Sequence, residues 1–222
     1  MNASQGEALP RFWTEAMAVP PAKGSRMARA ILHALGWQLD FQGLPSRQGV
    51  ILVYPHTSNW DFVLGVLVKW SLGLHFRFWG KDTLFRVPVM GAWMRYLGGV
   101  PVIRGSSQGV VGDTAELMKQ ACGRNEMFWL AVAPEGTRSW IAGWRTGAYQ
   151  VAVQAGVPVG LAYLDFATRR AGMTHFVQLS GDVERDFALF RSHLSSVRGL
   201  RADQASPIQA LSSSSTSKGE GA

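Results

Sequence analysis

Short apolar runs alternate with longer helical patterns along most of this chain, and this alternation limits the possible folds more than any other feature. Val50–Val53 and Met127–Val132 have the length and residue types of buried strands, whereas residues 62–74 and 108–124 have the length of helices. Strands that alternate with helices form layers around a central sheet. The sequence therefore predicts an α/β fold: a single layered domain with a mostly parallel or mixed sheet flanked by helices.

The 222 residues are enough for one domain with a sizeable core. We expect residues 1–24, which contain several prolines, to form a loosely structured lead. Residues 25–202 carry the strand and helix patterns of the domain. Residues 203–222 include a serine-rich run that cannot bury a core, so we expect a disordered tail without chemistry.

A histidine and an aspartate, His56 and Asp61, lie between the predicted strand at 50–53 and the helix that follows. A carboxylate can hold one ring nitrogen of a histidine while the other takes a proton from a substrate hydroxyl, so the pair is a candidate catalytic dyad. Ser58 and Asp61 also match a helix capping box, and the two interpretations both stand. Backbone N–H groups near this helix start are candidate donors for an oxyanion.

A second polar group, Glu135 to Arg138, follows the predicted strand at 127–132. Gly136 would permit a close approach of backbone or ligand, and Arg138 offers a planar fork of donors for a phosphate or carboxylate. The alternative is a turn in which Glu135 and Arg138 form an ordinary surface ion pair.

Two basic residues, Lys81 and Arg104, also end short apolar runs. The carboxyl ends of parallel strands meet at one edge of a sheet, where α/β proteins bind ligands. We therefore expect Lys81, Arg104, His56 and the stretch from Glu135 to Arg138 to converge there. The stretch 155–164 is interpreted as a helix end followed by a buried core strand.

In their order along the chain, these motifs resemble those of the glycerolipid acyltransferase family. The matching residues are His56 and Asp61; Lys81, Pro88, Gly91, Gly98 and Arg104; Pro134 to Ser139; and Val157, Pro158 and Val159. The resemblance covers about residues 50–165. It implies that His56 is the general base and Asp61 its orienting partner, and that the acceptor-headgroup site contains Lys81, Arg104, Glu135, Gly136, Thr137 and Arg138.

The resemblance also implies an O-acyltransferase of phospholipid biosynthesis that moves a fatty acyl group from acyl-CoA or acyl-carrier protein to a lysophospholipid hydroxyl, without a cofactor. The chain departs from the family pattern at Ala133, at Gly160 and in the apolar loop 140–147. These departures keep two alternatives open. One is the same chemistry on a lyso-ornithine or other acceptor, and the other is a membrane-surface lipid-binding protein without catalysis.

The net charge of +7 and the nine tryptophans favour an anionic, partly apolar partner. No nucleic-acid-binding motif, signal peptide or apolar run of about 18 residues is visible, so we expect peripheral binding to the cytoplasmic side of the cell membrane. Residues 26–37 could form an interfacial helix or pack on the domain. Residues 84–97 could be core, acyl-chain tunnel or membrane face.

Cys122, the only cysteine of the chain, excludes an internal disulfide. It shares the apolar face of the predicted helix at 108–124 with Val111, Ala115 and Met118, so we expect it in the core. The histidine and cysteine spacing matches no zinc site, and we expect no metal.

Overall fold

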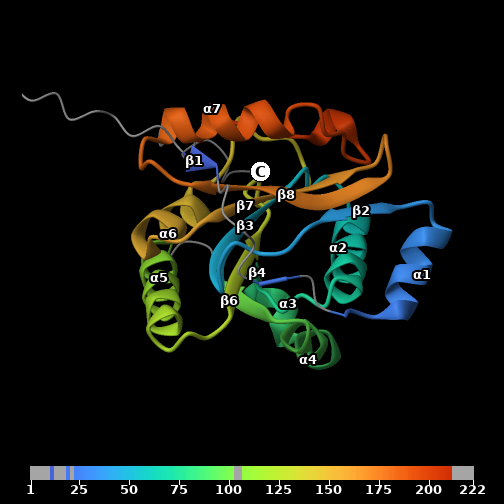
Figure 1. Cartoon of the computed structure of the whole chain (residues 1–222), viewed down its shortest axis with the longest axis horizontal. Coiled ribbons are helices and arrows are strands. Elements are labelled where there is room, and N and C mark those ends of the chain that lie inside the picture. Colours follow the sequence, from blue (N-terminus) through green and yellow to red (C-terminus); the bar gives the residue numbers. More distant parts are fainter. Residues whose placement is uncertain (1–10, 13–18, 21–22, 103–106, 212–222) are drawn as a thin grey trace, which may run out of the picture.

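The computed structural model describes residues 11–12, 19–20, 23–102 and 107–211, which form an α/β domain around one mixed sheet (Figure 1). The predicted fold class is confirmed. The described strands form an eight-stranded sheet in the order β1-β8-β7-β3-β6-β4-β5, with β2 also paired to β8. Five neighbouring strands, from β7 to β5, run parallel to one another.

The strands have the following bounds: β1 Arg11–Phe12, β2 Gln38–Phe41, β3 Gln48–Tyr54, β4 Arg77–Lys81, β5 Gly99–Val102, β6 Phe128–Val132, β7 Val159–Asp165 and β8 Arg170–Gln178. The helices are α1 Arg26–Ala34, α2 Asn59–Ser71, α3 Asp82–Arg86, α4 Pro88–Tyr96, α5 Ser107–Gly123, α6 Gly147–Ala155 and α7 Val183–Leu194, with a 3₁₀ turn at Ala202–Gln204. Within the described ranges, none of these helices combines the length and the hydropathy needed to cross a bilayer.

The apolar segment 84–97 folds into two short helices, α3 and α4, with Val87 in an extended conformation between them. Pro88 explains the break, because a proline disfavours helical geometry in the residue before it and suits the first position of a new helix. The first predicted helix, 62–74, begins earlier than expected, at Asn59, where Ser58 caps it.

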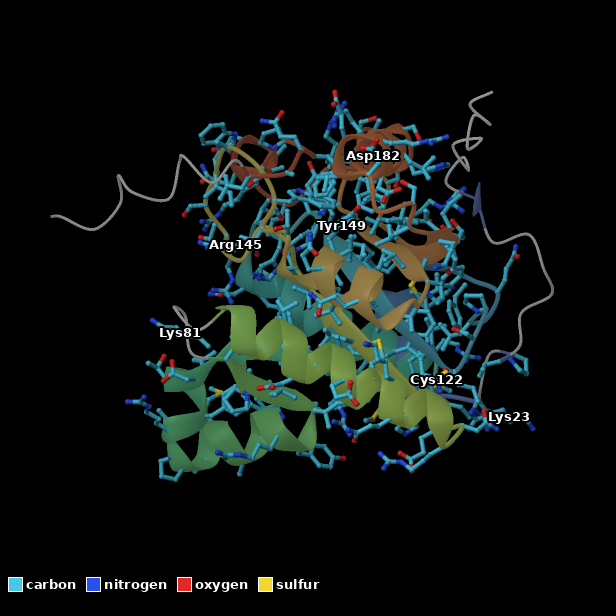
Figure 2. All side chains as sticks on the ribbon, turned by 90° about the vertical axis from the view of Figure 1, so that its left-hand side faces the viewer. Lys23, Lys81, Cys122, Arg145, Tyr149 and Asp182 are labelled. Atoms are coloured by element: carbon cyan, nitrogen blue, oxygen red, sulfur yellow. The ribbon has the colours of Figure 1, made fainter. Side chains whose placement is uncertain are left out.

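Cys122 does not lie in the core, and that prediction was wrong: its side chain is exposed near the end of α5 (Figure 2). The helix turns Ala121 inward after Met118, and both of these residues are almost fully buried. Positions 121 and 122, three and four residues after Met118, can both lie on the same face of the helix as Met118. In the structure the smaller residue, Ala121, packs into the core and Cys122 faces outward.

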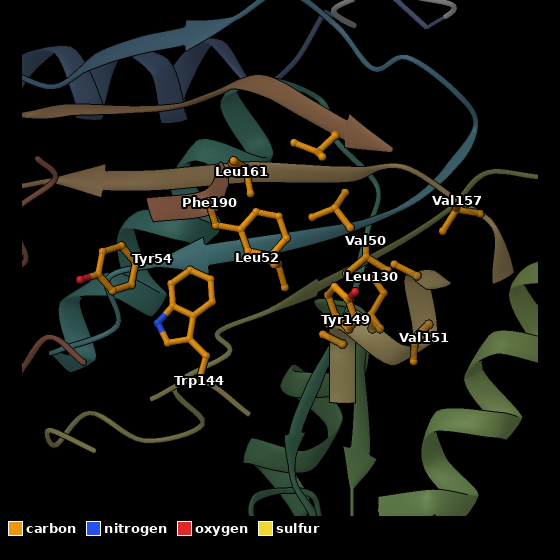
Figure 3. Close-up of a cluster of buried hydrophobic side chains, with 14 of the residues drawn as sticks. Val50, Leu52, Tyr54, Leu130, Trp144, Tyr149, Val151, Val157, Leu161 and Phe190 are labelled. Carbon is orange, nitrogen blue, oxygen red and sulfur yellow. The ribbon is translucent and has the colours of Figure 1, made fainter. Parts of the chain in front are cut away.

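Alternate residues of β3 point to opposite faces of the sheet, and both faces are buried. Val50 and Leu52 join the larger cluster, which includes residues of α5, α6 and α7 such as Phe190 (Figure 3). Ile51 and Val53 pack into the clusters on the other face, to which α1 and α2 contribute. The strand end that carries His56 is therefore fixed from both sides.

The described parts of both terminal segments are more ordered than the composition predicted, whereas residues 1–10, 13–18, 21–22 and 212–222 lie outside the described residues. Residues 203–211 do not form a disordered tail: Ser206 and Ile208 are buried, and Ala210 forms a β-bridge with Trp144. In the lead, β1 pairs with β8, and Val19 forms a bridge with Leu44. Backbone pairing to the domain supplies the order that the composition of these segments does not indicate.

Gly49 packs very closely against its register partner Trp129, because a Cβ on Gly49 would lie 2.3 Å from the indole ring. Gly49→Ala should destabilise the protein by about 1–3 kcal/mol through overpacking and lower the Tm by several degrees. Gly65→Ala in α2 is the matched control, because a Cβ there meets nothing within 4 Å and alanine favours the helix. Thermal unfolding of both variants tests this; equal Tm values would contradict the packing argument.

Candidate active site

The polar groups that follow the parallel strands lie at one edge of the sheet. His56 follows β3, Glu135 follows the neighbouring strand β6, and Lys81 ends β4. In Figure 2, Lys81 and Arg145 lie at the opposite end of the molecule from Cys122. The structure thus brings together the predicted strand ends, except Arg104, which lies outside the described residues.

The histidine and the aspartate face each other across the turn into α2. Nδ1 of His56 lies 3.5 Å from Oδ2 of Asp61, with the imidazole 20% exposed and the carboxylate 1% exposed. Oδ2 of Asp61 also accepts hydrogen bonds from the backbone N–H groups of Thr57 and Ser58, at 2.6 and 2.7 Å. A carboxylate held by two backbone donors cannot swing away, so it fixes the position from which it faces the imidazole.

The predicted capping box is also present, so the two interpretations of these residues are compatible. Ser58 Oγ accepts from the backbone N–H of Trp60 at 2.9 Å, and Asp61 bonds back to the Ser58 N–H. The N–H groups of Thr57, Ser58 and Trp60 are therefore already engaged. These three donors are not available to an oxyanion, and the use of another N–H group of this helix start stays a prediction.

The carboxylate of Glu135 is buried, at 1% exposed, and each of its oxygens accepts a backbone hydrogen bond. Oε2 accepts from the N–H of His56 at 2.5 Å, and Oε1 accepts from the N–H of Ser206 at 2.9 Å. Burial raises the pKa of the Glu135 carboxyl, while these donors from Ser206 and His56 oppose the rise. Glu135 therefore joins three separate segments: the end of β6, the loop 55–58 that carries His56 (the histidine loop), and the C-terminal segment 203–211.

This arrangement excludes the predicted surface ion pair between Glu135 and Arg138, since the carboxylate is buried and Arg138 is exposed. Both oxygens of Glu135 hold backbone donors, and its predicted contact with an acceptor headgroup stays a prediction. Sequence reasoning found the residue but not its partners. Ser206 lies 71 positions away and carries no motif.

Gly136 adopts a left-handed conformation with φ of +64°, and the side chain of Arg145 packs against it. A Cβ at this position would lie 2.8 Å from Nε of Arg145. The predicted close approach at Gly136 is thus made by a side chain of the same protein. Arg145 was not among the predicted headgroup residues, and it adds a cation next to Gly136.

The remaining predicted headgroup residues lie where a ligand could reach them. Arg138 and Lys81 are exposed, and Thr137 is half-buried and accepts a hydrogen bond from the backbone N–H of Ser139. Arg138, Lys81 and Arg145 are all cationic, so this edge of the sheet suits an anionic group. Within the described ranges, no cluster of histidine, cysteine and acidic side chains could hold a metal ion.

A cleft of about 390 Å³ opens beside the histidine loop. Its lining includes Tyr54, Trp140 and Arg198, together with Ser206 and its neighbours. The C-terminal wall of the cleft packs closely against the histidine loop, because a Cβ on Gly199 would lie 2.6 Å from Oγ1 of Thr57.

The apolar loop 140–147 has two parts with different roles. Trp144 is completely buried and contacts the rings of Tyr54, Phe187 and Phe190. Trp140 is 56% exposed and lies on the cleft. Core packing therefore explains one tryptophan of this loop, and only the other can contact a ligand.

Comparison with known proteins shows the family of the chain. A family model described as "Acyltransferase" matches residues 39–160, which is more than half of the chain. The chain therefore belongs to this acyltransferase family. The matched region contains β3, the histidine loop, β6 and the residues from Glu135 to Arg138, whereas Ser206 lies beyond it.

Two similar plant proteins are the chloroplastic 1-acyl-sn-glycerol-3-phosphate acyltransferases BAT2 of Brassica napus and LPAT1 of Arabidopsis thaliana. They are 29% and 28% identical over 126 residues, or 55% of this chain. The chain spans only about a third of their length, 36% and 35%. The crystal structure of the 1-acyl-sn-glycerophosphate acyltransferase PlsC from Thermotoga maritima has a TM-score of 0.48 and 18% identity, with 78% of each chain covered.

Glu135→Gln should lower both stability and turnover. An amide offers one oxygen where the carboxylate offered two, so one of the two backbone N–H groups would lose its acceptor at about 1–3 kcal/mol. We expect the Tm and kcat to fall while the acceptor KM changes little. Thermal unfolding and steady-state kinetics measure this, with the exposed Glu116→Gln on α5 as the control. A raised acceptor KM at unchanged Tm would instead show a direct contact with the acceptor.

Proposed function

We propose that this chain transfers a fatty acyl group from an acyl thioester, either acyl-CoA or acyl-carrier protein, to a hydroxyl of a lysophospholipid-type acceptor. The observation that carries the proposal is the imidazole of His56 held against the buried carboxylate of Asp61. The two plant relatives, whose names specify 1-acyl-sn-glycerol-3-phosphate, make that compound the first acceptor to test.

In the proposed reaction, Nε2 of His56 takes the proton from the acceptor hydroxyl. The hydroxyl oxygen attacks the thioester carbonyl carbon, a new C–O bond forms, and the C–S bond breaks. The proton then passes from His56 to the departing thiolate. General-base catalysis of this kind contributes about 10²- to 10⁴-fold, and positioning of the acceptor must supply a comparable share.

The acceptor phosphate is proposed to lie on the cationic edge formed by Arg138, Arg145 and Lys81. Arg104 belongs to this set by its motif alone. An arginine can give a phosphate two parallel hydrogen bonds, which fix orientation as well as charge. Gly136 and Thr137 shape the turn that presents Arg138. Glu135 acts in this scheme through the backbone of His56, as a positioning residue.

A second acceptor class is favoured by the cleft next to the histidine loop. Trp140 gives it an apolar wall and Arg198 gives it a cation. These groups would suit an acyl-bearing acceptor whose headgroup differs from glycerol phosphate, such as a lyso-ornithine lipid. The non-catalytic lipid-binding alternative lacks such support, because it leaves the ordered dyad without a role.

Because the acceptor and the product are lipids, we propose that the protein works at the surface of a membrane, on its cytoplasmic side. The net charge of +7 supports attraction to anionic lipid. No nucleic-acid partner, cofactor or metal enters the proposed reaction.

His56→Ala should reduce acyl transfer by about 10²-fold or more while the protein stays folded, because it removes only a general base on a partly exposed loop. Mass spectrometry of products from lysolipid panels, with acyl-CoA and acyl-carrier protein as donors, measures transfer, and circular dichroism measures folding. His75→Ala, at another exposed histidine, is the control and should retain activity. Full activity of His56→Ala would contradict the assignment of the base.

Arg138→Ala should raise the KM for an anionic acceptor by about 10- to 100-fold, because hydrogen bonds to charged groups contribute about 1.5–3 kcal/mol. The Tm should not change, since Arg138 is exposed. Arg124→Ala provides the control: Arg124 is exposed before β6, at the opposite edge of the sheet. A change in Tm without a change in KM would indicate a purely structural role for Arg138.

A further inference from the structure

The helix pair α3–α4 exposes large apolar side chains toward solvent. Val89 and Tyr96 are 84% and 80% exposed, and Val87 between the helices is 55% exposed. We define the α3–α4 apolar surface as Leu84, Val87, Val89, Met90, Trp93 and Tyr96, all of them exposed. Figure 1 shows these helices at the periphery of the molecule, with no other element beyond α4.

Packing within the domain does not account for this surface. The residues that α4 buries are Gly91 and Met94, on the side that faces the sheet. A helix on the surface of a soluble domain normally presents charged or polar residues on its outer face. Here the outer face is apolar over two helices, and an exposed patch of this kind marks a binding surface.

The charge around the patch is basic. Residues 77–100 contain four cationic side chains, Arg77, Lys81, Arg86 and Arg95, and one acidic side chain, Asp82. Asp82 pairs with Arg86 at 2.7 Å. The segment therefore keeps an excess of positive charge close to its apolar side chains.

We propose that the α3–α4 apolar surface enters the interfacial region of a membrane that contains anionic lipids. Trp93 and Tyr96 combine an apolar ring with a polar tip, as residues at the headgroup level of membranes do. The apolar face would lie below the headgroups, and the arginines and lysine would meet lipid phosphates. Basic charge beside an apolar helix face favours this partner over a protein surface.

The position of the surface connects it to the dyad. The ring of Phe62, the residue after Asp61, contacts the rings of Trp93 at 5.8 Å and Phe78 at 5.6 Å. An acyl chain that leaves the bilayer at α4 would thus meet apolar side chains up to the catalytic turn. This connection rests on the proposed function, whereas the membrane contact can be measured without any activity.

The test is co-sedimentation of the full chain with vesicles of phosphatidylcholine alone or with phosphatidylglycerol. Val89→Ser combined with Tyr96→Ser should weaken binding to the anionic vesicles by at least about tenfold, since each removed apolar side chain loses transfer free energy. Both positions are highly exposed, so the Tm should not change. Higher salt should also weaken wild-type binding, because the basic residues contribute to it.

Two matched variants make the result specific. Leu117→Ser with Val153→Ser changes exposed apolar residues on α5 and α6, across the sheet, and should leave binding unchanged. Met27→Ser with Leu35→Ser changes exposed apolar residues of α1 and of its C-cap. If only the α1 variant lost binding, the assignment to α3–α4 would be overturned.

Three further outcomes would also overturn the proposal: no binding of the wild type to either vesicle, unchanged binding of the Val89/Tyr96 variant, or loss of a dimer in that variant with vesicle binding intact. The last would identify a second copy of the chain as the partner.

The proposed activity is tested separately with a short-chain lysolipid and acyl donor below their micellar concentrations, where the Val89/Tyr96 variant should match wild type. If acyl transfer were absent while vesicle binding still depended on α4, the proposed activity would be refuted and the proposed membrane-binding surface would stand.

Discussion

The arrangement of the site depends on one buried carboxylate. The buried carboxylate of Glu135 accepts a hydrogen bond from the N–H of His56 on one oxygen and from the N–H of Ser206 on the other. A buried donor that loses its acceptor costs about 1–3 kcal/mol, so these two bonds stabilise the three segments against one another. The position of the candidate base is thereby coupled to the C-terminal segment 203–211, which lies outside the region matched by the family model.

Asp61 has a comparable double function at the other side of His56. One of its oxygens accepts hydrogen bonds from the backbone N–H groups of Thr57 and Ser58, just before α2, and also faces the imidazole. The same carboxylate thus starts a helix and orients a candidate general base. The cap therefore fixes the carboxylate of the dyad, while Glu135 holds the backbone of the histidine. The parallel strands then place Lys81, at the end of β4, and Arg138, in the loop after β6, at the same edge.

The sequence predicted those parts of the fold that follow from local patterns. The apolar strands around Val50 and Leu130, the cap at Ser58 and the convergence of strand ends needed only periodicity and parallel pairing. It could not predict contacts between distant segments, such as that of Glu135 with Ser206, because backbone donors leave no mark in the sequence. The order of residues 203–211 was missed for the same reason: they precede a serine-rich run and carry no strand or helix pattern, but their backbone is paired. Arg104 lies outside the described residues and stays a prediction.

Amide hydrogen exchange of His56 and Ser206 tests the central claim most directly, because it reports on the two bonds to Glu135 one residue at a time. The account predicts slow exchange at both amides in the wild type, and faster exchange at one or both in Glu135→Gln. Fast exchange at both amides in the folded wild type, or no change at either in the variant, would show that this carboxylate does not hold the histidine loop.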